Sequence, residues 1–175
     1  MNIKLIQGLY YQSCWFLFLI SSHYSEILQL LLILITLFLH YWFISQNSKR
    51  DFYSALTYVV LGLLLDQTFI QLKWVQLHHP FSLHPLWLIG MWIQFGHSYN
   101  YSLSWFTFHP KNLLCLIFFL GPLAYYAGVK FNIWQFADPL LMTSAKMGIA
   151  WLVLTFTGYK IHQAILQKFP HPSLS

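Results

Sequence analysis

Charged residues are scarce in this sequence. Of its 175 residues, 7% are charged, whereas 58% are hydrophobic and 20% are aromatic. A soluble domain carries about 25% charged residues, so this chain has too few to cover a water-exposed surface. Its nine Lys and Arg residues are scattered and form no phosphate-binding patch. The composition therefore predicts a membrane protein that has the lipid bilayer as a partner and does not bind nucleic acid.

Paired cysteines and catalytic signature motifs are also missing. Cys14 and Cys115 each stand alone in an apolar run, outside any Cys-x-x-Cys pair. The sequence has no Gly-x-Ser-x-Gly, His-Glu-x-x-His, Walker or Gly-x-Gly-x-x-Gly motif. We therefore assign no catalytic residue and no cofactor. Whether the protein is an enzyme stays open, and the lack of these motifs favours a non-enzymatic function.

Three histidines gather in one segment, at His78, His79 and His84, and Asp138 lies in another segment expected on the same side of the membrane. These side chains are metal ligands by type, but their spacing matches no recognised metal site. We predict no metal.

Long apolar runs dominate what is present. A helix of about 20 apolar residues crosses the ~30 Å hydrocarbon core of a bilayer. Cutting the runs at polar, Pro and Gly residues gives six segments, at residues 5–21, 27–45, 52–72, 85–106, 112–129 and 139–160. The second is rich in Leu and Ile and is predicted to face lipid. The fold class is therefore predicted as all-α, a polytopic membrane bundle of about six transmembrane helices. It forms one domain over residues 1–169, followed by a short disordered tail at 170–175.

The distribution of basic residues predicts the orientation. With the N-terminus inside, the Lys and Arg residues expected in the cytoplasm are Lys4, Lys49, Arg50, Lys111, Lys160 and Lys168. Those expected outside are Lys73 and Lys130. Cytoplasmic segments of membrane proteins carry an excess of basic residues, so both termini are predicted to be cytoplasmic.

One carboxylate, Asp66, lies inside the third apolar run, and one ammonium, Lys146, lies inside the sixth. At 1.5 Å per residue, both lie roughly 9–11 Å below the outer ends of their helices. A charge at this depth is costly unless it is paired, so the two residues are candidate partners. Two alternatives stay open. The pair only locks two helices together, or Lys146 extends outward while hydroxyls and amides hold Asp66 neutral.

The fourth segment carries a polar face. Its members recur at steps of three and four residues and are Gly90, Gln94, His97, Asn100 with Tyr101, and Ser104. Such a face either lines a cavity or forms hydrogen bonds to neighbouring helices, and the second is the commoner case. His97 is the residue to expect if protons move, because its unperturbed pKa lies near neutrality.

The fifth segment contains Pro122, which removes a backbone donor and is expected to kink its helix. Gly121, Ala124 and Gly128 form a small-residue face that allows close helix packing. The segment is either a bent packing seam or a broken helix beside a ligand cavity.

Several of these features occur together in one known family. They are Gln12 with Cys14-Trp15-Phe16, Gly62-Leu63-Leu64-Leu65-Asp66, Pro85-Leu86-Trp87, His97-Ser98, and Gly121-Pro122-Leu123-Ala124-Tyr125-Tyr126-Ala127-Gly128. Nearly the whole chain resembles a family of small bacterial inner-membrane proteins that is classified only as a domain of unknown function. The resemblance implies a polytopic helical protein and no established activity. A weaker similarity, through Gly62-Leu63-Leu64-Leu65-Asp66, is to the rod-shape-determining membrane subunit MreD.

Three functions remain. The first is a non-enzymatic assembly or scaffold subunit of an envelope complex, with a membrane-protein partner or as a homo-oligomer, because long loops are absent. The second is a small transporter or substrate-binding subunit that uses Asp66 and His97. It predicts an enclosed polar cavity shared by Asp66 and His97 or Asn100. The third is a lipid-modifying enzyme with Asp66 or His97 as acid or base.

Overall fold

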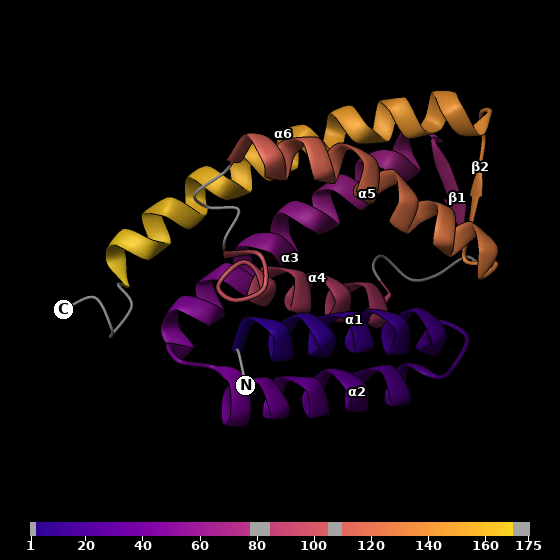
Figure 1. The fold of residues 1–175 in the computed structure, drawn as a ribbon. Helices are drawn as coiled ribbons and strands as arrows, with labels where there is room; N and C mark the ends of the chain where they lie inside the picture. Colours follow the sequence, from indigo (N-terminus) through magenta and orange to yellow (C-terminus); the bar gives the residue numbers. More distant parts are fainter. Residues whose placement is uncertain (1–2, 78–84, 105–109, 170–175) are drawn as a thin grey trace.

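The computed structural model describes residues 3–77, 85–104 and 110–169, which form helices and one small β-ribbon (Figure 1). The predictions for His78, His79, His84 and the tail at 170–175 lie outside these residues. In chain order the elements are α1 (Ile3–Ser21), α2 (Glu26–Leu39), the π-helical turn η1 (His40–Ile44), α3 (Ser48–Gln71), β1 (Val75–Leu77), α4 (Leu86–Ser98), α5 (Pro110–Lys130), β2 (Trp134–Phe136) and α6 (Leu140–Lys168). The all-α prediction is confirmed.

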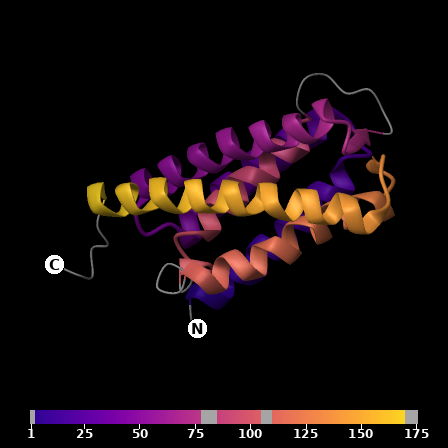
Figure 2. The same ribbon diagram turned by 90° about the horizontal axis from the view of Figure 1, so that it is seen from above.

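The helices form a layered bundle. Helices α3 and α4 pack closely against each other in the middle; α1 and α2 contact α4 on one side, and α6 contacts α3 and α5 on the other. Figures 1 and 2 show the chain passing back and forth along the bundle, so that both termini lie toward the end opposite the β-ribbon. We call these the terminal end and the ribbon end.

Four described segments are long and apolar enough to cross a membrane. They are Glu26–Ile44, Ser48–Gln71, Lys111–Lys130 and Leu140–Lys168. Six spanning helices are therefore not confirmed. The sixth segment is also longer than expected, because α6 continues to Lys168.

The fourth predicted segment, 85–106, yields a helix of only 13 residues. This helix, α4, ends at Ser98, where the Ser98 hydroxyl bonds back to the Phe95 carbonyl oxygen and the backbone changes to i→i−3 bonds, from Asn100 N to His97 O and from Tyr101 N to Ser98 O. At 1.5 Å per residue, α4 is about 20 Å long, too short to cross the hydrocarbon core. Most of its side chains are buried, so it is a core helix enclosed by α1, α2 and α3.

Helix α2 is not lipid-facing on all sides. Its buried positions recur at steps of three and four and continue into η1, at Gln29, Ile33, Thr36 and His40. The opposite face is exposed, with Ile27 72% and Leu34 55% exposed. The lipid-facing prediction therefore describes one face of this helix, and the other face turns polar side chains toward α4.

A two-stranded antiparallel β-ribbon, absent from the sequence-based prediction, joins the ends of α3 and α5. The register pairs Val75 with Phe136 and Leu77 with Trp134. Lys73 and Asn132, directly after the two helices, both have positive φ, of 57° and 54°. In each case the backbone closes the helix with the paired hydrogen bonds of a Schellman motif, so the chain turns at once into its strand.

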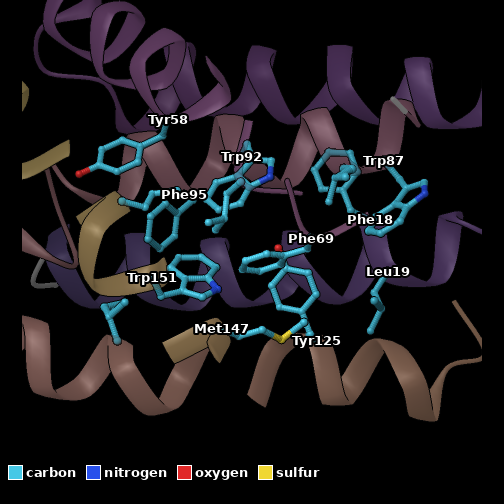
Figure 3. Packing of buried hydrophobic residues seen from close by; sticks show 14 of the residues in the cluster. Phe18, Leu19, Tyr58, Phe69, Trp87, Trp92, Phe95, Tyr125, Met147 and Trp151 are labelled. Atoms are coloured by element: carbon cyan, nitrogen blue, oxygen red, sulfur yellow. The ribbon is translucent and has the colours of Figure 1, made fainter. Parts of the chain in front are cut away.

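An aromatic core fills the space between the layers. Figure 3 shows Phe95, Trp92 and Trp151 lying next to one another, with Tyr58 toward one side and Phe69 toward the other. Trp92 and Trp151 stack with ring centroids 5.3 Å apart. Each buried aromatic ring removes a large apolar area from its surroundings, and many of the buried core residues are aromatic.

Candidate functional site

Asp66 lies on α3 toward the ribbon end and is 1% exposed. Its carboxylate accepts hydrogen bonds from Trp92 Nε1 on α4, at 2.6 Å, and from the Tyr125 hydroxyl on α5. Three helices therefore meet at this carboxylate. Indole and phenol donors are suited to a membrane interior, because each satisfies a carboxylate oxygen while its ring packs against apolar neighbours.

Asp66 and Lys146 do not pair. Lys146 Nζ lies 2.6 Å from Asp138 Oδ2, and it also lies 5.8 Å from the Trp74 ring centroid beside the β-ribbon. Its long side chain extends from α6 toward the ribbon end, which keeps the ammonium partly exposed. Of the alternatives weighed for these residues, the structure supports an outward-reaching Lys146 and an Asp66 held by neutral donors.

A cavity of about 420 Å³ lies beside Asp66. Helices α1 and α5 form its walls, and α4 with Asp66 and Trp151 forms its inner surface. Phe16, Leu120 and Leu123 at its rim are 45%, 44% and 56% exposed, so the cavity opens toward the surroundings of the bundle rather than being sealed inside it. Its lining is mainly aromatic and aliphatic, and Asp66 is the one charged side chain among the described residues that line it.

The predicted packing face of α5 borders this cavity. Gly121 is buried against Trp151: a Cβ at this position would lie 2.4 Å from that ring. Ala124 lines the cavity, whereas Gly128 packs in the same close way against Trp134 of β2. Pro122 is buried within a helix that continues from Pro110 to Lys130, so α5 is not broken there.

A second polar cluster, centred on Asp51, lies at the terminal end. Asp51 Oδ2 accepts hydrogen bonds from Ser45 Oγ at 2.6 Å and Tyr101 OH at 2.7 Å, and it lies 3.2 Å from His40 Nε2. Asn100 Nδ2 donates to Asp51 Oδ1 at 2.8 Å. Burial raises the pKa of Tyr101 to about 12, so its hydroxyl remains a donor near neutral pH. Asp51 thus joins η1, α3 and the turn after α4.

His97 belongs to this second cluster. Its ring stacks on that of His40 with centroids 3.7 Å apart and planes inclined by 5°. Neither ring nitrogen of His97 has a hydrogen-bond partner among the described residues. In parallel stacking the nitrogen lone pairs of the two rings lie in separate planes, which does not suit shared binding of one metal ion. Within the described ranges, no three His, Cys, Asp or Glu side chains form a metal-binding group.

The polar face predicted for the fourth segment is therefore divided. His97 and Asn100 join Asp51, whereas Gln94 Nε2 donates to the Tyr10 hydroxyl of α1 at 3.5 Å. Gly90 receives the Phe18 ring, since a Cβ there would lie 2.4 Å from it. The helix ends before Asn100, so the later members of the face depart from helical spacing. Most members serve contacts between helices.

Aromatic side chains separate the two carboxylates. Tyr58 and Tyr99 stack with centroids 4.3 Å apart, and Phe95 contacts Tyr58 at 5.2 Å and Trp151 at 5.8 Å. The polar cavity predicted to join Asp66 to His97 or Asn100 is not present among the described residues, because these rings fill that level of the bundle (Figure 3).

Sequence reasoning missed Asp51, His40 and His162. In the sequence, Arg50 served only as a basic residue that marks the cytoplasmic side and Asp51 was not singled out, although Asn47 caps the N-terminus of α3 just before them and places Asp51 in the first turn. His40 shares the helical face of Gln29 and Thr36, a spacing that could have marked it as buried. Nothing in the sequence indicated that His162 Nδ1 would lie 3.4 Å from Ser54 Oγ.

Comparison with known families gives one match. The family described as protein of unknown function (DUF2878) matches residues 4–157, so the chain belongs to that family. No curated protein and no solved structure matches. The resemblance to a family of unknown function is thus confirmed, and the weaker resemblance to MreD is not shown.

Proposed function

We propose that this member of the DUF2878 family is a polytopic protein of the bacterial inner membrane that binds a lipid-like molecule beside Asp66. The observation that carries the proposal is the cavity of about 420 Å³ with a single carboxylate among aromatic and aliphatic residues. Ligand sites in proteins have volumes of roughly 300–1,000 Å³ and combine an apolar lining with a few placed polar groups. The cavity has both properties.

The open rim supports entry from the bilayer. In a membrane, Phe16, Leu120 and Leu123 face hydrocarbon, so an apolar chain can enter between α1 and α5 without crossing water. Asp66 then recognises the polar end of the ligand. A carboxylate has about four acceptor positions, and Trp92 and Tyr125 use two of them. The ligand class is therefore an amphipathic molecule whose apolar chain ends in a hydroxyl or amine donor.

We propose further that both termini are cytoplasmic. The two termini lie toward the same end of the bundle (Figures 1 and 2), and Lys49, Arg50, Lys111 and Lys168 lie at that end. This asymmetry is what the positive-inside rule requires of a cytoplasmic side. Fluorescent-protein or phosphatase fusions at the C-terminus test the orientation, and phosphatase activity there would contradict it.

An assembly role in an envelope complex remains a second proposal. Its support is the shortness of the described connections: the chain between α1 and α2 spans only residues 22–25, and that between η1 and α3 only 45–47. Helices without extramembrane domains suit a subunit that acts through a partner. Stable co-isolation of one protein from native membranes would support this role, and isolation of the protein unaccompanied would count against it.

Ligand binding is tested by extraction of lipids from the purified protein. The wild-type protein, kept in native membrane patches, is expected to retain about one molecule per chain of a species enriched over the bulk lipid. Asp66→Asn is expected to lower its amount at least about fivefold, because a charge-assisted hydrogen bond of about 1.5–3 kcal/mol is lost. Ala124→Phe is expected to abolish retention by filling the cavity. Mass spectrometry of the extract measures each amount.

Ala145→Phe is the matched control, because Ala145 is an exposed residue of α6 outside the cavity. It adds the same ring without changing the site and is expected to retain the ligand. The proposal fails if the wild-type extract has the composition of the surrounding membrane. It also fails if Asp66→Asn and Ala124→Phe retain as much ligand as the control while thermal melting shows that both variants are folded.

A further inference from the structure

Arg50 is buried without a counter-charge. It lies in the first turn of α3 and is 2% exposed. Its Nε and Nη2 atoms have no hydrogen-bond partner among the described residues. The Arg50 guanidinium carbon lies 5.9 Å from the centroid of the Tyr101 ring, which covers it without neutralising its charge. A buried ion in this state is strongly unfavourable unless an anion and hydrogen bonds compensate it.

No carboxylate side chain of the protein fills this role. The sequence contains four Asp and Glu residues in all, Glu26, Asp51, Asp66 and Asp138. Asp138 pairs with Lys146, and Asp66 lies on α3 about 16 residues beyond Arg50, roughly 24 Å along the helix. Glu26 begins α2 at the ribbon end.

Asp51 is adjacent in sequence but is directed elsewhere. Its carboxylate is occupied by Ser45, Tyr101, Asn100 and His40. Among the described residues, Lys146 and Asp138 form an ion pair and His40 Nε2 lies 3.2 Å from Asp51 Oδ2, and neither contact includes Arg50. The counter-anion of Arg50 must therefore come from outside the side chains of this protein.

We propose that Arg50 binds one phosphate-type oxyanion at the terminal end of the bundle. Nε and Nη2 lie on the same edge of a guanidinium group, and together they donate two parallel hydrogen bonds to two oxygens of one anion. These are the two nitrogens that are buried and unpartnered. Ser54 lies one helical turn after Arg50 on α3, and its Oγ lies 3.4 Å from His162 Nδ1 on α6, so two polar side chains lie along the helical face that carries Arg50.

The anion has two natural sources with the same chemistry. One is the phosphodiester of an anionic phospholipid, since the terminal end lies where headgroups meet the spanning segments. The other is free phosphate. This site is independent of the cavity beside Asp66, because the aromatic layer of Tyr58, Tyr99 and Phe95 lies between them.

The test uses the full chain with a C-terminal tag, which moves its terminal carboxylate away and prevents it from supplying the anion. The protein in neutral detergent is titrated with phosphatidylglycerol, with zwitterionic phosphatidylcholine and with inorganic phosphate. Thermal melting and native mass spectrometry are recorded for each. Phosphatidylglycerol is expected to raise the Tm of the wild type by about 5 °C and to remain bound at one molecule per chain. An equal rise with inorganic phosphate supports the site and identifies the free ion as its ligand.

Arg50→Gln is expected to lose this response, with a Tm rise below about 1 °C. Arg50→Lys keeps the positive charge but lacks the two parallel donors of the guanidinium group, and it is expected to show a partial rise in Tm. Lys111→Gln is the matched control: it removes the same charge from an exposed residue at the same end and is expected to respond like the wild type. If Arg50→Gln responds as the wild type does, or if phosphatidylcholine stabilises the wild type equally while phosphate has no effect, the proposal is refuted.

Discussion

Gly96→Ala is the substitution that examines the contact between α3 and α4 most directly. A Cβ added at Gly96 would lie 2.6 Å from Ala55 Cα and 2.7 Å from the Ser54 carbonyl oxygen. Both atoms belong to the backbone, so no side chain can rotate away. The two helices would have to separate by roughly 1 Å to restore ordinary contact in a close-packed interior.

The magnitude follows from two opposing effects. Overpacking in a core costs about 1–3 kcal/mol, and the upper part of this range applies because backbone must move. Replacing Gly by Ala within a helix stabilises the folded state by about 1 kcal/mol through higher helix propensity. The net loss is therefore about 2 kcal/mol, which corresponds to a Tm lower by about 4–8 °C for a chain of this size. The hydrogen bond from Asn100 to Ser54 Oγ, 3.1 Å in length, would lengthen as the helices part.

Gly8→Ala is the matched control for this prediction. Its added Cβ would lie 3.6 Å from Ser102 Cβ, an ordinary contact, so only the gain in helix propensity remains. The control is expected to melt at or slightly above the wild-type temperature. Thermal melting of the detergent-solubilised proteins, monitored by fluorescence-detected size-exclusion chromatography, measures the melting temperatures of both variants. The reasoning is refuted if Gly96→Ala melts as high as Gly8→Ala.

Two further predictions concern the polar groups. Asp51→Asn is expected to lower stability by about 3 kcal/mol, because charge-assisted hydrogen bonds from one buried and two partly buried donors become neutral or are lost. Ser45→Ala, which removes one of them, should cost about 1 kcal/mol, and equal melting temperatures for the two variants would contradict this account of Asp51. Lys146→Met is expected to change stability by less than about 1 kcal/mol, because its ion pair with Asp138 is 30% and 37% exposed on the two sides. A loss of several kcal/mol on melting would instead indicate a buried partner for Lys146.

The helical fold and the presence of helices apolar enough to cross a membrane were predictable because they depend on local composition. A mainly apolar segment such as residues 52–72 can satisfy its backbone in a membrane only as a helix or a closed barrel strand, and its length of about 20 residues identifies a helix. The same reasoning failed for residues 85–106. An apolar helix that is enclosed by other helices has the composition of one that crosses lipid, and here only the early end at Ser98 distinguishes them.

The candidate sites were predictable only in part. Asp66 was identified because a carboxylate in an apolar run stands out, but its donors Trp92 and Tyr125 have the appearance of ordinary core residues in the sequence. Asp51 was overlooked because it follows Lys49 and Arg50 at a helix start, where charged residues are common. Identification of a polar residue is thus easier than identification of its partner.

The sequence alone determined that this chain is helical, with helices long and apolar enough to cross a membrane, because hydrophobicity and helix length are properties of a single segment. The tertiary structure decided which charges meet. Asp138 rather than Asp66 pairs with Lys146, and Asp51 contacts His40 from one part of the chain and Asn100 and Tyr101 from another. These contacts depend on how distant helices pack and in which direction each side chain points. Helical spacing gives the face on which a residue lies, whereas only packing gives the neighbour that this face meets.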